Sequence, residues 1–364
     1  MVMLVELPFA WGLTMSIHPS LLLLLLTFPI IAASGPDAHA VVAELADQRI
    51  ADKTRKDLST VMGDGYRLAH AASWFDAMKA TRSWMVGLDR AHNAHCDFDY
   101  KRDCSNGRCL AGAIWNYTNR MIDPYLSKDQ RNEAVKFLIH LVADAHMPLN
   151  AGRTADQGGD TINVHINFAD FTNVNLHKAW EEKILDEMEG ALYPGSYVQQ
   201  DASGSTDRMK FWRVSSNLLG ADLDQRYAGK VPSWLAECTE HGLNACIDKM
   251  LTESADLACR VAYRHIDGRD IQTNDGLMRE YYTSRVGVLQ EQLAKAAARL
   301  AWIMDDAFRN FTGTTTTPNP SSTTTRGPAS TTTPSTTGQP GSFATIGYSP
   351  FLTFIFTLSA YALF

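Results

Sequence analysis

The sequence predicts an all-α fold, in which one large helical domain takes up most of the 364 residues. Apolar residues recur at spacings of three and four, segment after segment, up to about residue 300, which is the pattern of helices with one buried face. Convincing runs of alternating polar and apolar residues, which would indicate strands, are scarce. Six cysteines predict that disulfides staple this domain.

The first expected helix is His39–Ile50, HAVVAELADQRI, which is amphipathic. The same pattern continues in Asn132–Ala145, Val174–Met188, Thr206–Leu219, Leu251–Tyr263 and Gly276–Arg309. The last of these segments contains VLQEQLAKAAARLAWIMDDAF, a run of strong helix formers. The short stretch Thr161–Phe168 is the best candidate for a hairpin.

The N-terminus, residues 1–33, has the pattern of a signal peptide. Leu21–Ala33 is an apolar run that ends in small residues, so cleavage is expected after Ala33. No Lys or Arg precedes this run, which is atypical, and Met15 is an alternative start. A retained membrane anchor is the competing interpretation.

The C-terminus changes composition abruptly after Phe311. Residues 312–342 are nearly all Thr, Ser, Pro and Gly, and such a segment is expected to form an extended, O-glycosylated stalk. Residues 343–364 end in an apolar tail, which resembles a lipid-anchor signal with small residues near Ser335–Gly338. A short transmembrane helix and a soluble protein with an apolar tail are the alternatives. The expected location is the secretory pathway, then the exterior or the cell surface.

The net charge of −7 disfavours a protein that holds nucleic acid through a broad basic surface. It does not exclude an enzyme whose bound metal ions supply positive charge locally. Sequons at Asn116 and Asn310 agree with secretion and predict glycosylation.

The cysteines agree with an oxidising compartment and allow several pairings. Cys104 and Cys109 are close enough in sequence for a small loop, as are Cys238 and Cys246. This arrangement leaves a long-range pair, Cys96–Cys259. The sequence leaves open whether Cys238 and Cys246 pair.

The stretch Phe137–Asn150, FLIHLVADAHMPLN, carries the strongest chemical signal. It begins as a helix with His140 and Asp144 four residues apart on one face, and Pro148 is expected to end it. Imidazole and carboxylate are both good ligands for a divalent ion, although a buried His bonded to an Asp is a common structural arrangement. A second pair with the same spacing, His177 and Glu181 in NLHKAWE, favours a metal cluster between two helices.

Together with SWFD at Ser73–Asp76 and GGDTINV at Gly158–Val164, these motifs resemble the zinc-dependent class I nucleases. That is the single-strand nuclease and 3′-nucleotidase family of the mung bean nuclease type. The resemblance covers about residues 34–310 and implies a nuclease domain at 34–311. It implies an all-helical fold related to bacterial phospholipase C, with up to three metals in a cleft. The family pattern also supports the disulfides Cys104–Cys109 and Cys96–Cys259.

The resemblance implies three metal subsites. The first would use Asp76, Asp89, His140 and Asp144; the second would use Asn150, His177 and Glu181; the third would use the backbone of Ser34 together with His39 and Asp144. Asp89 and Asn150 stand where the family has histidines, Glu181 where it has Asp, and Ser34 where it has Trp.

Zinc is the family default, but the altered ligands favour another ion. Asp89, Asn150 and Glu181 offer hard oxygen donors, which calcium prefers over nitrogen. We therefore expect Ca²⁺, or Mn²⁺ or Mg²⁺, in at least one subsite. The retained histidines keep a mixed cluster open.

The expected chemistry is hydrolysis of phosphate esters, for which the metal ions supply the nucleophile and the charge stabilisation. Asp76, Asp144 and Lys79 are the expected catalytic residues, and Lys79 replaces a family Arg that steadies the phosphate. Arg90, His92 and Phe171 are candidates to contact the substrate, although Phe171 could equally belong to the core. Because Arg90 replaces an aromatic residue, looser base discrimination is expected.

The leading interpretation is a secreted or surface-anchored endonuclease that acts on DNA and RNA, favours single strands and also accepts 3′-nucleotides. The chain is expected to be monomeric, with a membrane as partner of its tail. A pseudoenzyme that binds nucleic acid without hydrolysis is the first alternative, because three ligands differ. A phospholipase C is the second.

Overall fold

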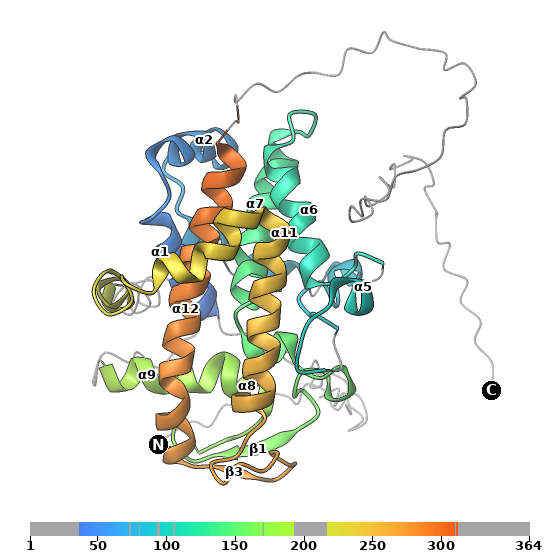
Figure 1. Ribbon diagram of the computed structural model, residues 1–364, viewed down its shortest axis with the longest axis vertical. Coiled ribbons are helices and arrows are strands. Elements are labelled where there is room, and N and C mark those ends of the chain that lie inside the picture. Colours follow the sequence, from blue (N-terminus) through green and yellow to red (C-terminus); the bar gives the residue numbers. More distant parts are fainter. Residues whose placement is uncertain are drawn as a thin grey trace, which may run out of the picture. The chain divides into compact units, whose positions relative to one another are not determined.

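The computed structural model describes residues 36–72, 74–79, 81–92, 95–104, 106–169, 171–192, 217–309 and 311. Across these residues the fold is all-α with one small sheet, as predicted (Figure 1). The predicted signal peptide, Ser34, Asn310, the stalk, the C-terminal tail and most of Thr206–Leu219 lie outside the described residues. None of the described helices is both long and apolar enough to cross a membrane.

The bounds of the elements are as follows. The α-helices are α1 Pro36–Asp47, α2 Asp52–Met62, α3 Leu68–Ala71, α4 Trp74–Lys79, α5 Tyr100–Asp103, α6 Leu110–Ile122, α7 Lys128–Asp144, α8 Leu176–Lys178, α9 Ile184–Leu192, α11 Val231–Leu257 and α12 Arg279–Phe308. Short 3₁₀ turns are Ser83–Met85, Pro148–Ala151 and Thr154–Asp156, and π-helical turns are Ala179–Lys183 and Ala258–Ala262. The strands are β1 Asn163–Ile166, β2 Asn173–Asn175 and β3 Gly276–Leu277.

Helix α7 lies at the centre of the fold. Ser127 caps it: the Ser127 hydroxyl accepts from the Gln130 N–H, and the Gln130 side chain accepts from the Ser127 N–H. This capping box starts the helix a turn earlier than the apolar pattern alone predicts. The helix ends at Asp144, four residues before Pro148, so its predicted end is confirmed.

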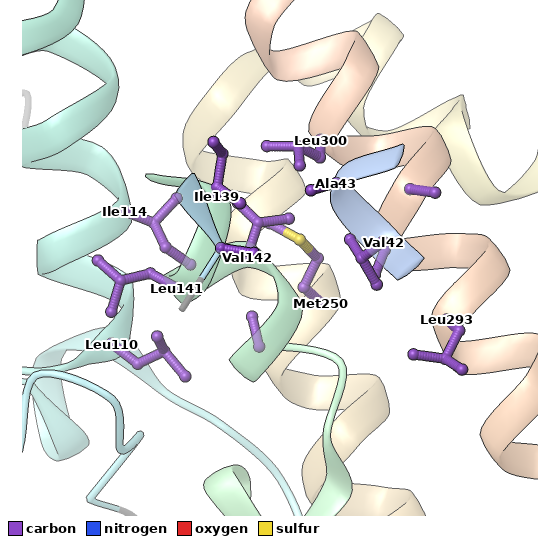
Figure 2. Packing of buried hydrophobic residues seen from close by; sticks show 14 of the residues in the cluster. Val42, Ala43, Leu110, Ile114, Ile139, Leu141, Val142, Met250, Leu293 and Leu300 are labelled. Carbon is purple, nitrogen blue, oxygen red and sulfur yellow. The ribbon is translucent and has the colours of Figure 1, made fainter. Parts of the chain in front are cut away.

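The core forms where α7 packs against α1, α6 and α12. Figure 2 shows Ile139, Leu141 and Val142 of α7 between Ile114 on α6 and Leu300 on α12. These side chains are fully or almost fully buried. Such packing fixes the rotation of α7 about its axis, and this rotation decides where His140 and Asp144 point.

The long helices α11 and α12 pack against each other. Helix α11 and the π-helical turn after it contain most of the segment predicted as Leu251–Tyr263. Helix α12 contains most of Gly276–Arg309, but Gly276 and Leu277 form strand β3 instead. Helix α11 bends at Gly242, which has φ of 83° and is not helical. Figure 1 shows the two segments of α11 meeting at an angle. The Cys238–Cys246 disulfide closes a short loop across this bend, so the pairing that the sequence left open does form.

The sheet has the order β2–β1–β3, with β2 antiparallel and β3 parallel to β1. The candidate hairpin Thr161–Phe168 supplies only one strand, β1, and Val164 pairs with Val174 of β2. Strand β2 therefore takes the start of the segment predicted to be helical from Val174. The Asn175 side chain accepts a hydrogen bond from the Lys178 N–H, and this cap delays the start of the helix to Leu176.

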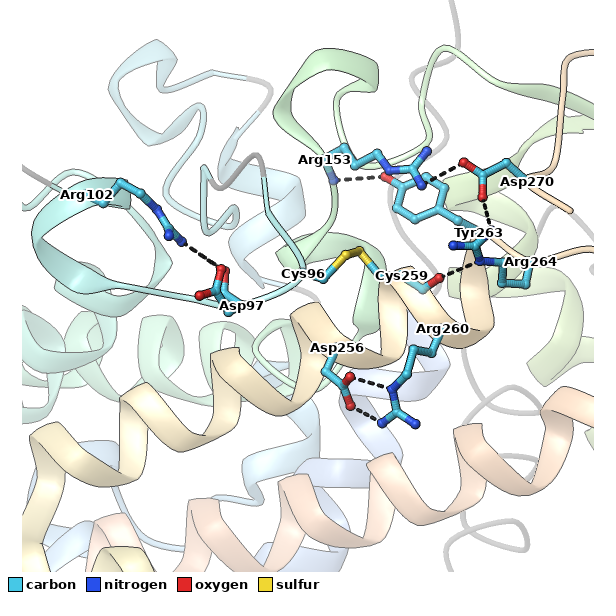
Figure 3. The surroundings of a disulfide bond; sticks show 10 residues. All are labelled: Cys96, Asp97, Arg102, Arg153, Asp256, Cys259, Arg260, Tyr263, Arg264 and Asp270. Carbon is cyan, nitrogen blue, oxygen red and sulfur yellow. Dashed lines mark hydrogen bonds and ion pairs between the residues drawn. A yellow bond between two sulfur atoms is a disulfide. The ribbon is translucent and has the colours of Figure 1, made fainter. Parts of the chain in front are cut away.

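The two other expected disulfides are also present. Cys104–Cys109 closes a small loop before α6, and Cys96–Cys259 joins residues separated by 163 positions. Figure 3 shows Cys96–Cys259 linking the segment before α5 to the π-helical turn after α11. Beside it, Arg153 Nη2 lies 2.9 Å from Asp270 Oδ2, and the Arg153 backbone N–H donates to Tyr263 Oη.

Candidate metal centre

Three helices bring one carboxylate and two imidazoles together inside the fold. His39 lies on α1, Asp76 on α4 and His140 on α7, and their ligand atoms lie within 4.8 Å of one another. Both histidines are buried. His39 and His140 stack with parallel rings whose centroids are 4.0 Å apart, and Phe75 stacks on His140 at 4.2 Å. This stacking fixes the direction of both imidazole rings.

Asp144 connects the two imidazoles. Its Oδ1 lies 3.1 Å from His39 Nε2, and its Oδ2 lies 3.0 Å from His140 Nε2. The amide of Asn150 also donates to Asp144 Oδ1, at 3.1 Å. The buried carboxylate therefore has three of the expected ligand side chains as neighbours.

The electrostatics of this group favour a bound cation. Burial alone would lower the pKa of His39, but the hydrogen bond and charge of Asp144 raise it to about 9. The site thus attracts positive charge, and a metal ion bound to His39 would displace the proton of this imidazole. Burial disfavours ionised Asp144, yet His140 and His39 hold its pKa well below its usual range. Burial raises the pKa of Asp76, and Asp76 Oδ2 is buried without a hydrogen-bond partner. Buried carboxylates that face imidazoles fit a divalent cation, so the residues present suit the metal that the motifs imply.

A second group of expected ligands, His177 and Glu181, lies directly after β2, on α8 and on the π-helical turn that follows it. His177 Nδ1 lies 2.9 Å from the Gly158 carbonyl oxygen, and His177 Nε2 lies 3.8 Å from Glu181 Oε2 one turn on. Burial and the charge of Arg90 lower the pKa of His177 to about 3, which keeps the imidazole neutral and able to bind metal. His39, Asp144 and Glu181 share the lining of a cavity of about 30 Å³. This cavity is where the two groups meet.

Asp89, an expected ligand of the first subsite, takes part in an ion pair. Among the described residues, the ligand atoms that all lie within 4.8 Å of one another belong to His39, Asp76 and His140, and neither Asp89 nor Asp144 meets this criterion. The Lys79 ammonium donates to Asp89 Oδ2. Burial alone would lower the pKa of Lys79, but Asp89 and Asp144 raise it above its usual value.

Arg90, predicted to contact the substrate, is held by protein groups. Its Nη2 lies 3.1 Å from Asp160 Oδ2, and its Nη1 lies 2.9 Å from His177 Nδ1 and 3.2 Å from the Gln157 carbonyl oxygen. Asp160 lies within the motif GGDTINV, but the sequence pattern did not predict that it pairs with Arg90. The contact depends on the loop, in which Gln157, Gly158 and Gly159 all have positive φ. The position of Asp160 directly after Gly158 and Gly159 was the sequence signal that could have indicated this contact.

The remaining predicted residues lie at the surface, are partly buried, or are not among the residues that the structure describes. Phe171 is 79% exposed and has φ of 51°, so the alternative that it belongs to the core is wrong. His92 is exposed and its Nε2 lies 2.7 Å from the Gly87 carbonyl oxygen. Ser34 lies outside the described residues, and Asn116 is partly buried on α6.

Comparison with known proteins agrees with this geometry. A family model described as S1/P1 Nuclease matches residues 34–309. Endonuclease 5 of Arabidopsis thaliana is 31% identical over 293 residues, 75% of this chain and 90% of that protein. Endonuclease 2 of the same plant is 28% identical over 299 residues, 78% of this chain and 94% of that protein. Nuclease P1 of Penicillium citrinum is 28% identical over 279 residues, 74% of this chain and 96% of that protein. The helical fold, the buried histidine and carboxylate group and these matches show that the chain belongs to the S1/P1 nuclease family.

Proposed function

We propose that this chain is a metal-dependent endonuclease that hydrolyses phosphodiester bonds of DNA and RNA, favours single strands, and also acts on 3′-nucleotides. The observation that carries the proposal is Asp144, buried between His39 and His140, with Asp76 Oδ2 unsatisfied beside them. Membership of a nuclease family supports a hydrolytic role for this group.

The residues proposed to hold metal ions come from both groups. They are His39, Asp76, His140, Asp144, Asn150, His177 and Glu181, with the Ser34 backbone as a further proposed donor. When bound, the ions would polarise the phosphate and lower the pKa of a water molecule. Asp144 orients both imidazoles, and the Gly158 carbonyl orients His177.

The proposed ions are Ca²⁺, Mn²⁺ or Mg²⁺ at the oxygen-rich side of the site, with zinc as the family default. Asn150 and Glu181 offer oxygen donors there, whereas His39 and His140 offer nitrogen. Because one side offers oxygen donors and the other offers nitrogen donors, we propose a cluster that holds more than one kind of metal ion.

For substrate contacts, we propose that Phe171 stacks on an unpaired base. Its exposed ring is free of the core, and base stacking favours single strands. His92, which is also exposed, is a second proposed contact. Arg90 is less suited to stacking, because Asp160 and the Gln157 carbonyl oxygen hold its guanidinium.

We further propose that the chain is secreted and glycosylated at Asn116 and Asn310, held near a membrane by its lipid-anchored C-terminus, and monomeric. Three disulfides support an oxidising compartment.

The proposal is tested by chelating the full chain, expressed through a secretory pathway, and adding back Ca²⁺, Mn²⁺ and Zn²⁺ separately. Hydrolysis of single-stranded DNA is the readout, and circular dichroism checks the fold. Recovery with calcium supports the oxygen-rich site, whereas recovery with zinc alone would contradict it. A folded chain that no metal reactivates would favour the pseudoenzyme that binds without hydrolysis.

A further inference from the structure

The ion pair between Lys79 and Asp89 lies beside the metal centre. Lys79 ends α4, three residues after Asp76, so both side chains leave the same face of the helix. Asp89 is 7% exposed, and the Lys79 ammonium donates to its carboxylate. A cation supplied by the chain therefore occupies the carboxylate that the motifs suggest as a metal ligand.

We infer that Lys79 takes the place of one divalent ion next to Asp89, so that the chain binds one ion fewer than its acidic side chains would otherwise hold. The inference rests on the proposed metal-dependent function and concerns how many ions that same site takes.

The Asp89 carboxylate already has a cationic partner, because its Oδ2 is engaged by the Lys79 ammonium. A divalent ion on the same carboxylate would lie beside the ammonium group and would be repelled by it.

The charge of Lys79 acts on carboxylates other than Asp89. Lys79 interacts electrostatically with Asp76 and with Asp144 as well as with Asp89. It thus offsets part of the negative charge that would attract an additional ion to this side of the site.

The neighbouring cation, Arg90, is engaged by a different carboxylate. Arg90 follows Asp89 in sequence, but its guanidinium pairs with Asp160 at 3.1 Å and contacts His177. Arg90 is thus committed to the other side of the site. The sequence neighbours Asp89 and Arg90 therefore belong to two separate ion pairs, Lys79–Asp89 and Arg90–Asp160.

The test counts the ions bound per chain by native mass spectrometry, with the full chain saturated first with Zn²⁺ and then with Ca²⁺. We expect Lys79→Met to bind one ion more than the unaltered chain, because Met keeps the length of the side chain and removes its charge. Lys79→Arg should leave the count unchanged. In the double variant Lys79→Met with Asp89→Asn, the additional ion should be lost again.

Lys53→Met serves as the control, because Lys53 pairs with Asp57 on α2, and it should not change the count. An equal count for Lys79→Met and the unaltered chain, both folded and both binding metal, would overturn the inference while leaving the proposed function intact. If neither chain binds any ion, the proposed metal-dependent function fails instead.

Discussion

Asp144 is the residue on which the proposed centre depends most. Its two oxygens contact His39 and His140, and Asn150 donates to it. Asp144→Asn keeps the shape but removes the charge that holds the two imidazoles. We expect loss of bound metal and at least about a hundredfold fall in DNA hydrolysis, since even residues that only orient metal ligands cost 10- to 100-fold. Metal analysis and initial rates measure both, with Asp64→Asn, an exposed carboxylate after α2, as control. Full activity of Asp144→Asn would exclude this carboxylate as a ligand.

Phe171 tests how the substrate is held. Because the ring is 79% exposed, Phe171→Ala should leave stability unchanged. If a base stacks on the ring, the change should raise KM for single-stranded DNA by about tenfold to a hundredfold, because stacking contributes about 1–3 kcal/mol per base. Steady-state kinetics measure this, and Tyr125→Ala, at another exposed aromatic residue between α6 and α7, is the control. An unchanged KM would remove Phe171 from the substrate surface.

At the residue scale, sequence spacing predicted the pairs but not their partners. His140 with Asp144, and His177 with Glu181, follow from positions four apart on a helix. The close approach of Asp144 to His39, 105 positions earlier, depends on how α1 packs against α7. Likewise the Arg90–Asp160 contact depends on three consecutive residues with positive φ, which no periodic pattern describes.

At the scale of elements, long periodic segments were predictable and short or capped ones were not. Helices α1, α7, α11 and α12 overlap their predicted segments, because each has an apolar face. Helix α6 was not predicted, although it packs against α7 and carries buried residues over most of its length. Strand β2 lies within a predicted helix because the Asn175 cap, a local hydrogen bond, sets the start of α8.

Helices α11 and α12 are joined by a buried ionic contact that should make stability depend on pH. Arg299 on α12 is fully buried and lies 2.9 Å from Glu253 Oε2 on α11. Burial opposes ionisation of Glu253, but Arg299 and Lys295 lower its pKa below the usual value of 4.5. A lowered folded-state pKa stabilises the fold above pH 4.5, and this stabilisation is lost as the pH falls through the folded-state value.

We therefore expect Glu253→Gln to cost about 3 kcal/mol of unfolding free energy at pH 7, because it leaves the charge of Arg299 buried without its partner. The difference from the unaltered chain should shrink as the pH falls below 4.5. Urea unfolding at pH 7 and at pH 4 measures it, with the exposed Glu240→Gln on α11 as control. A cost that does not change with pH would assign Glu253 a packing role instead of an electrostatic one.

At the scale of the whole molecule, the sequence and the family resemblance predicted Cys96–Cys259 and Cys104–Cys109 but left open whether Cys238 and Cys246 pair, and what each disulfide constrains required the structure. Cys238 and Cys246 lie eight positions apart on either side of the bend in α11. Cys96 and Cys259 lie 163 positions apart and join the segment before α5 to the turn after α11. Cross-links that close longer loops remove more conformational entropy from the unfolded chain.

Removing each cross-link should therefore have unequal effects on stability. Replacing Cys96 and Cys259 with Ala should lower the unfolding free energy by about 5 kcal/mol, and replacing Cys238 and Cys246 by about 3 kcal/mol, because the first loop is far longer. Urea unfolding of both double variants at one temperature shows which variant loses more unfolding free energy. Since neither pair supplies a proposed ligand, the metal content of folded protein should be the same in both. The reverse order would mean that the bend in α11 depends on its disulfide, and that native-state geometry outweighs loop length in this fold.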